Sequence, residues 1–307
     1  MKILYLSNSD RCDYMRDMLC HGLRTLLGPD LVDAVKIETL YQSFPKVSEL
    51  YGKGFTLYGL LPEIEVDRIE IDAKIRSKYF DLVIFSSVPR FNDNHELFFL
   101  LGIVLESYPR NQIIFIDGAD DPDLYRDLMK CGLYFKRERK NPVPESFSIQ
   151  FAIPEEKIAP PEQMKDLLLA PLNQWDPRTY IYTDEESYYR DYRRSLFGRT
   201  SRKCGWDCLR HYEIMACNAI PYFENIEECP ETLMMNLPKK ELILAKQLFE
   251  YREGAIFRTN AGKDIWQSLM SIIATNLRDN LTTVALAKRV LDTVHQIQGK
   301  TVEMVTA

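Results

Sequence analysis

The sequence lacks any apolar run that approaches the roughly 20 residues of a transmembrane helix, so we expect no integral membrane segment. Its first residues, MKILYLSNSDRCD, soon become polar, which argues against a signal peptide. The seven cysteines form no C-x-x-C pair, a pattern that favours reduced thiols and a cytoplasmic location. The formal net charge of −6 argues against nucleic acid as a partner.

Several catalytic motifs are also missing. The sequence contains no G-x-G-x-x-G fingerprint, no P-loop and no G-x-S-x-G, which removes the usual signatures of dinucleotide enzymes, NTPases and serine hydrolases. The four histidines show no H-x-x-x-H or triad pattern. Cys204, Cys208 and His211 are spaced C-x3-C-x2-H, which is not a usual zinc spacing. We therefore predict a protein without a bound metal.

The first half of the chain alternates between short apolar, β-branched runs and longer segments with helical spacing. This alternation predicts a parallel sheet covered by helices on both faces, as in a Rossmann-like domain. The expected strands are 2–7, 35–40, 81–86, 112–116 and 133–137, and the expected helices are 14–27, 67–78, 98–108 and 122–130.

Seven of the sixteen prolines lie between Pro142 and Pro177, which argues against a long regular element there and predicts an interdomain linker. We expect two α/β domains that face each other across a cleft, residues 1–150 and 151–280. Residues 281–307 are expected to form a helix that crosses back to the first domain.

The second half has its own expected elements. A capping box at Thr183 and Glu186 predicts a helix that runs to about Phe197 and is ended by Gly198. Asp207 is the expected N-cap of a buried helix over 208–217, followed by a left-handed Asn218. A strand over 219–223 and helices over 239–251, 261–277 and 281–298 complete the prediction.

A basic segment stands out in this acidic chain. Residues 190–210 hold seven basic side chains and two acidic ones, which favours a local pocket for one small anionic ligand. The helix that begins behind Gly205 would direct its N-terminus at such an anion. Glu213 lies one turn deeper, where a carboxylate can accept hydrogen bonds from two vicinal hydroxyls. The alternative is that Arg210 and Glu213 only pair with each other.

The run from Gly205 to Phe223, GWDCLRHYEIMACNAIPYF, resembles the nucleotide-sugar motif of two-domain (GT-B type) glycosyltransferases, above all of the exostosin-like and spore-maturation (CgeB-like) groups. Their pattern is G-x-D-x-x-R-x-x-E-x-x-x-x-G-x-I-P, and Asn218 stands here at the second glycine. Softer similarity extends over residues 110–245. The resemblance implies that Arg210 contacts the donor diphosphate and Glu213 the ribose. The whole implied donor site comprises Arg199, Lys203, Gly205, Asp207, Arg210 and Glu213.

Catalysis by such an enzyme requires a base for the acceptor hydroxyl. Asp117 and Asp120 are the candidates, because four carboxylates occur in the seven residues 117–123 at the end of an expected strand. Two other interpretations stay open, a metal site and a turn whose aspartates cap the next helix. Ser7, Asn8 and Ser9, after the first strand, are expected on the acceptor side. Gly205 occupies the position of a second glutamate of retaining relatives, which favours inversion.

The resemblance therefore implies a glycosyltransferase that uses a UDP- or GDP-linked sugar as co-substrate, needs no metal and modifies a glycan or a small hydroxyl compound. Arg210 would stabilise the departing diphosphate. Two alternatives remain. The first is a non-catalytic nucleotide-sugar-binding module or degenerate subunit of a glycosylation complex, and the second is a Rossmann enzyme for another nucleotide.

Overall fold

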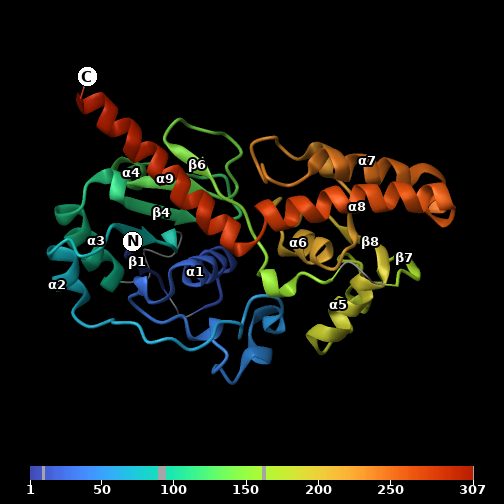
Figure 1. Ribbon diagram of the computed structural model, residues 1–307, viewed down its shortest axis with the longest axis horizontal. Coiled ribbons are helices and arrows are strands. Elements are labelled where there is room, and N and C mark those ends of the chain that lie inside the picture. The colour runs from blue at the N-terminus through green and yellow to red at the C-terminus, as the bar shows by residue number, and fades with distance from the viewer. Residues whose placement is uncertain (9–10, 89–94, 161–163, 307) are drawn as a thin grey trace. The chain divides into compact units, whose positions relative to one another are not determined.

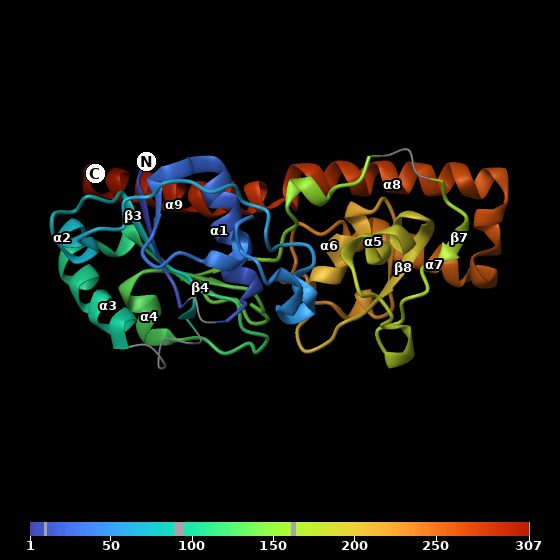
Figure 2. The same ribbon diagram turned by 90° about the horizontal axis from the view of Figure 1, so that it is seen from below.

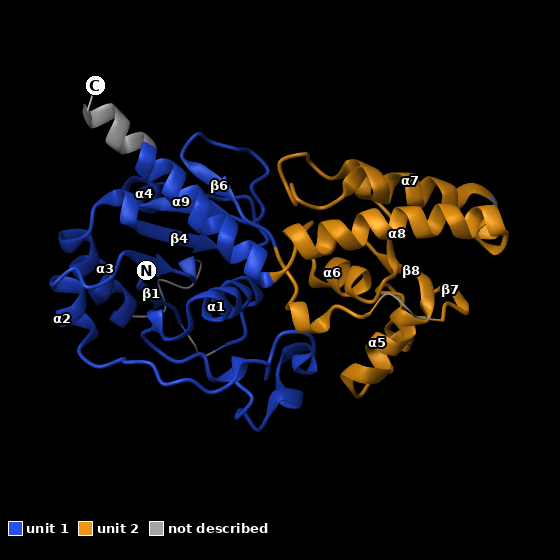
Figure 3. Cartoon of the chain, in the orientation of Figure 1, with its two compact units in different colours: residues 1–150, 283–307 blue, residues 151–282 orange. Residues whose placement is uncertain are grey.

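The computed structural model describes residues 1–8, 11–88, 95–160 and 164–306 (Figure 1). The chain divides into two compact units, residues 1–150 with 283–307 and residues 151–282 (Figure 3). Each unit contains a parallel sheet and helices, so the chain belongs to the α/β class.

In the described part of the first unit, six parallel strands form one sheet in the order β2-β1-β3-β4-β5-β6. The order reverses between β1 and β3, which makes the carboxyl ends of these two strands the switch point where ligands of such sheets usually bind. This topology is compatible with a Rossmann-like fold. The strands are β1 (Ile3–Leu6), β2 (Leu31–Asp33), β3 (Leu82–Phe85), β4 (Ile113–Asp117), β5 (Leu133–Lys136) and β6 (Ser146–Ser148).

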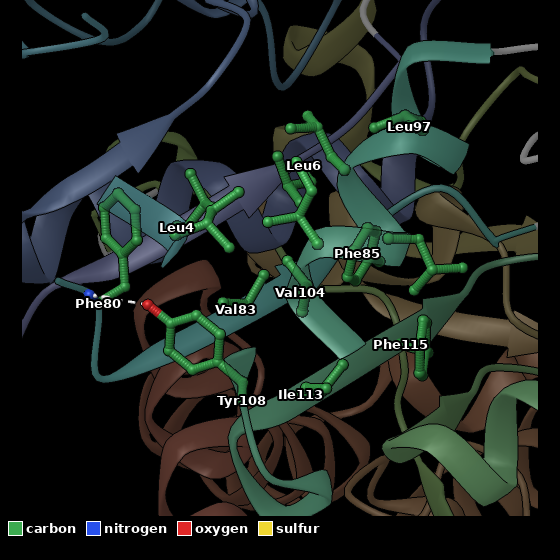
Figure 4. Packing of buried hydrophobic residues seen from close by; sticks show 14 of the residues in the cluster. Leu4, Leu6, Phe80, Val83, Phe85, Leu97, Val104, Tyr108, Ile113 and Phe115 are labelled. Atoms are coloured by element: carbon green, nitrogen blue, oxygen red, sulfur yellow. Dashed lines mark hydrogen bonds between the residues drawn. The ribbon is translucent and has the colours of Figure 1, made fainter. Parts of the chain in front are cut away.

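One face of this sheet forms an apolar core with helices α2 (Ile71–Arg76), α3 (His95–Ser107) and α4 (Arg126–Cys131). Every second residue of a strand points to the same face, so Leu4 and Leu6 meet side chains of β3, β4 and α3 there (Figure 4). The backbone N–H of Phe80 donates to the hydroxyl of Tyr108 at 3.2 Å beside this core.

The other face packs against α1 (Tyr14–Leu27), which in turn packs against α9 (Thr283–Thr306). The two helices lie side by side in both ribbon views (Figures 1 and 2). Their close approach depends on Gly22, because a Cβ atom there would lie 1.9 Å from the carbonyl oxygen of Thr283. His21 Nδ1 also lies 3.0 Å from Thr283 Oγ1.

In the second unit, the described strands form a three-stranded parallel sheet in the order β7-β8-β9. Helices α7 and α8 run side by side (Figures 1 and 2). Gly198 in β8 is needed for close packing, since a Cβ there would lie 2.8 Å from Ile214 Cγ1 of α6. The elements are β7 (Leu167–Leu169), α5 (Glu185–Arg193), β8 (Ser195–Thr200), α6 (Leu209–Ala216), β9 (Ile220–Phe223), α7 (Lys239–Glu250) and α8 (Asn260–Asn280).

Several local predictions were wrong. The second strand is 31–33 and not 35–40, where residues 38–40 form a short 3-10 helix. The proline-rich segment contains β6 and β7, both too short to give a recognisable pattern. The helix predicted to begin after Thr183 has Asp184 as its N-cap and ends at Arg193. Residues 195–200 pair with strands on both sides, and this tertiary pairing overrides their local helical pattern.

Asp207 is not the N-cap of α6, because Cys208 takes that position. The left-handed conformation predicted for Asn218 is confirmed by its φ of 52°.

Candidate functional site

The carboxyl ends of β7, β8 and β9 lie at one edge of the second sheet, and polar side chains connect the loops that follow them. Gln174, after β7, donates from Nε2 to the hydroxyl of Ser201, after β8. Trp175 Nε1 donates to Glu224 Oε2, after β9, at 3.2 Å. Such an edge is where parallel α/β sheets usually bind their ligands. The three loops therefore form the candidate site of the second unit.

Arg210 is the central cation of this site. It lies in the first turn of α6, is half-buried, and donates from Nη1 to Gln174 Oε1 at 3.0 Å and from Nη2 to the hydroxyl of Tyr180 at 3.1 Å. Its Nε is buried and has no hydrogen-bond partner among the described residues. Arg210 also forms no ion pair with a carboxylate of those residues. Burial lowers the pKa of Arg210, but neighbouring tyrosines and the nearby charge of Glu213 raise it above its ordinary value without a direct ion pair. A partly buried guanidinium whose hydrogen-bond partners are neutral can still donate to an anion.

Glu213 lies one helical turn after Arg210 and is buried. Its Oε2 accepts a hydrogen bond of 2.5 Å from the hydroxyl of Tyr188 in α5. Burial, and then the charge of Glu213, raise the pKa of Tyr188 well above its ordinary value. The phenol therefore stays protonated and donates a hydrogen bond to the carboxylate. Tyr188 and Tyr192 are both buried and stack edge to face, as expected for packing residues.

Arg199 and Lys203 have different surroundings from Arg210. Arg199 projects from β8, pairs with Glu224 Oε1 at 2.7 Å, and lies over the ring of Tyr222. Lys203 is exposed, and its backbone N–H donates to the carbonyl oxygen of Gly205 at 3.2 Å in a tight turn before α6. The charge of Arg199 is therefore already balanced, so Arg210 is the better placed of the two to bind an anion.

Asp207 fixes the loop that carries the site. Its buried carboxylate accepts hydrogen bonds from the backbone N–H of Phe151 at 2.6 Å and from the hydroxyl of Tyr212 at 2.8 Å. These contacts attach the start of α6 to the first residue of the second unit. The observed contacts of Asp207 are thus structural, and they explain why its oxygens do not cap the helix.

His211, the residue after Arg210 in the sequence, is fully buried. Its Nδ1 lies 2.9 Å from Thr200 Oγ1, and its Nε2 lies 2.9 Å from the carbonyl oxygen of Trp206, which can only accept. Nε2 therefore carries the proton, and Nδ1 accepts from the threonine. Burial lowers the pKa of His211 to about 4, so the ring is neutral at pH 7.

In the first unit, both candidate bases are engaged in ion pairs. Asp117 is fully buried and accepts from the hydroxyl of Tyr134, from Lys136 Nζ at 3.0 Å and from the backbone N–H of Ala119 at 3.0 Å. Asp120 lies on the surface, with half of its side chain exposed, and pairs with the guanidinium of Arg137. Of the two, Asp120 is the more accessible to an acceptor.

The alternative in which these aspartates cap the next helix is wrong. Helix α4 begins at Arg126 and has Tyr125 as its N-cap. The aspartates instead stabilise turns within their own loop, where Asp121 Oδ1 accepts from the backbone N–H of Asp123 at 3.0 Å.

The switch point of the first sheet carries two hydroxyl groups. Ser7 follows β1 and Ser87 follows β3, and both Oγ atoms are buried without a hydrogen-bond partner among the described residues. The carbonyl oxygen of Asn8 accepts from the guanidinium of Arg16, while Ser9 lies outside the described residues. Ser7 thus remains a candidate for acceptor binding, and Ser87 joins it.

Three residues of the second-unit site escaped the sequence prediction: Gln174, Trp175 and Tyr180. They follow β7, a three-residue strand inside the segment interpreted as a linker. Had that strand been recognised, the exposed ring of Trp175 (61% exposed) at its carboxyl end would have marked the loop as a candidate binding site.

Within the described ranges, no group of three or more His, Cys, Asp or Glu side chains is arranged to hold a metal ion. The same part of the chain has no helix that is both long and apolar enough to span a membrane. Comparisons with protein-family models, curated proteins and solved structures find no match for this chain.

Proposed function

We propose that this protein is a glycosyltransferase that transfers a sugar from a nucleotide diphosphate sugar to an acceptor hydroxyl, and that the second unit binds the donor. The observation that carries the proposal is Arg210, a half-buried guanidinium at the start of α6 whose hydrogen-bond partners are neutral and whose Nε has none among the described residues. Backbone N–H groups at a helix start and a cation together favour a diphosphate. In this proposal Glu213, one turn deeper, would accept hydrogen bonds from the ribose hydroxyls.

The proposed reaction is a direct displacement. The acceptor hydroxyl attacks the anomeric carbon, the bond to the diphosphate breaks, and the configuration inverts. Arg210 stabilises the negative charge that develops on the leaving diphosphate, so the protein supplies the cation and no metal is required. Trp175, whose indole is exposed beside Glu224, offers a ring for stacking against the donor.

The acceptor side is assigned to the first unit. The proton of the attacking hydroxyl goes to a carboxylate, and we assign this role to Asp120 in preference to Asp117, because both are ion-paired but Asp117 is fully buried. Ser7 would hydrogen-bond the acceptor. The proposal includes the GT-B arrangement, in which the carboxyl edges of the two sheets face one cleft.

Ligand-dependent thermal stabilisation provides the first test. At 100 times its dissociation constant, a nucleoside diphosphate stabilises the protein by about 2.7 kcal/mol, which raises the melting temperature by several degrees. We expect one of UDP, GDP, ADP and dTDP to do so, with or without Mg²⁺. Arg210→Ala should lose the shift. Arg178→Ala removes an exposed arginine that pairs with Asp176 in the same loop, and it should keep the shift.

Turnover gives the second test. Removing one preorganised group that stabilises the transition-state charge costs about 3–4 kcal/mol, or roughly 10²–10³ in rate. The turnover of Arg210→Ala should therefore fall by that factor, without a change in the circular dichroism spectrum. Arg210→Ala activity equal to that of the wild type would refute the assignment.

A second candidate function is a nucleotide-sugar-binding module without activity. The ion pairs of Asp117 and Asp120 favour it, because each carboxylate is already occupied by a cationic side chain, Lys136 or Arg137. Slow hydrolysis of the bound donor in the absence of acceptor distinguishes the two functions. A transferase releases the free sugar over time, whereas a pure binding module leaves the donor intact.

A further inference from the structure

A cavity lies in the second unit, at the opposite end of its sheet from the Arg210 site. This cavity has a volume of about 590 Å³. Lys165 and Asp166 line it just before β7 begins, and Leu196 lines it near the start of β8, so it opens at the amino ends of the parallel strands. The far wall comes from Phe257 and from the first turns of α8. The volume suits a small organic molecule.

The charged residues of the cavity are mostly cationic. Lys165, Arg258 and Lys263 line it, and the acid among the lining residues, Asp166, is paired with Arg194 at 2.5 Å. Arg258 and Lys263 form no ion pair with a carboxylate among the residues that the structure describes. The cavity therefore carries a positive charge that an anionic ligand would balance.

Lys165 is held in place by the ends of two helices. Its Nζ donates to the carbonyl oxygen of Arg193, the last residue of α5, at 2.7 Å and to that of Cys217, directly after α6, at 3.2 Å. Burial lowers its pKa to about 8. A nearby anion would therefore stabilise the charged form of this lysine.

Apart from Gln267, the uncharged residues of the lining are apolar or aromatic, and one aromatic ring is held in place. Trp266 Nε1 donates to the carbonyl oxygen of Leu196 at 3.0 Å, which holds the indole in place, and Lys165 Nζ lies 5.6 Å from the centre of that indole. Leu167, Leu168 and Phe257 complete the apolar surface. An inorganic anion would leave this surface without a partner, whereas a flat ring with one acidic group would use both features.

We propose that this cavity binds a small aromatic carboxylate, at a site separate from the one that holds the donor. The ring would pack against Trp266 and the leucines, and the carboxylate would face Arg258 and Lys263. This inference does not depend on the glycosyltransferase proposal, because it uses none of the residues of the Arg210 site.

Calorimetric titration of the full chain with 1-naphthoate tests the proposal. Two comparison ligands separate its features: 1-naphthalenemethanol has the ring without the charge, and inorganic phosphate has the charge without the ring. We expect measurable binding of 1-naphthoate, and affinity for either comparison ligand at least fivefold lower. Equal affinity for the naphthoate and the alcohol, or no binding of the naphthoate, would overturn the proposal.

Charge variants locate the site. An exposed ion pair contributes up to about 1 kcal/mol, so Lys263→Met should weaken naphthoate binding about threefold and Lys263→Met with Arg258→Gln about tenfold. The control, Lys240→Met with Arg278→Gln, removes the same charge from exposed positions of α7 and α8 outside the lining. It should leave binding unchanged, and so should Arg210→Ala. Equal losses in the two double variants, or loss in Arg210→Ala, would place the ligand elsewhere.

Discussion

The buried imidazole of His211 makes the stability of the second unit depend on pH in a range where few other groups titrate. In the folded protein burial lowers the pKa of His211 to about 4, whereas an unfolded histidine has a pKa of about 6.5. The unfolded state therefore binds a proton between these values that the folded state does not. The contribution of neutral His211 to the free energy of unfolding is therefore complete above pH 6.5 and is lost as the pH falls toward 4.

The size of the effect follows from the two pKa values. From pH 7 to pH 5, a group with these values loses about 2 kcal/mol of its contribution to the free energy of unfolding. The assay can be confined to one unit, because the three tryptophans, Trp175, Trp206 and Trp266, all lie in residues 151–282. We expect tryptophan fluorescence in urea to show a lower midpoint at pH 5 with an unchanged slope.

His211 is the one histidine in the sequence between residues 151 and 282, so a matched variant isolates it. His211→Gln can still donate to the carbonyl oxygen of Trp206 and accept from Thr200, and it does not titrate in this range. The urea midpoint of this variant should be nearly the same at pH 7 and pH 5, whatever its overall stability. A wild type without pH dependence, or a variant that keeps it, would refute the buried neutral imidazole.

Two further predictions concern stability. Asp207→Ala removes the acceptor of the buried N–H of Phe151 and of the Tyr212 hydroxyl, and it should lower the free energy of unfolding by about 3 kcal/mol, measured by tryptophan fluorescence. Asp207→Asn can bond both groups and should lower it by less than about 1 kcal/mol; equal losses in the two variants would contradict this role of Asp207. Gly22→Ala places a methyl group against the backbone of Thr283 and should destabilise the first unit by about 2 kcal/mol. Amide hydrogen exchange in α9 should become faster, and unchanged exchange would show that α1 and α9 do not pack at this position.

The longer elements follow from their own sequence. The apolar spacing and polar ends of residues 14–27 predict a helix with the observed bounds of α1, and the buried runs of β1, β3 and β4 are recognisable within a residue or two. A run of this kind contains enough side chains to show its period, so local pattern and final structure agree.

The short strands do not follow in this way. β7 contains three residues inside a proline-rich segment, and β8 continues a helical pattern until pairing with β7 and β9 makes it a strand. These errors also concealed part of the site, because Gln174 and Trp175 become candidates only once β7 is known to end at the same edge as β8.

The sequence by itself determined the α/β class, the positive segment and the spacing of Arg210 and Glu213 on one helix, because these depend on composition and on periods of a few residues. Only the tertiary structure decided the environment of each charge. Arg199 and Arg210 are both arginines in the same basic segment, yet Arg199 meets the carboxylate that follows β9 and Arg210 meets an amide and a phenol. Partners distant in the sequence set that difference, and it determines which cation is available to a ligand.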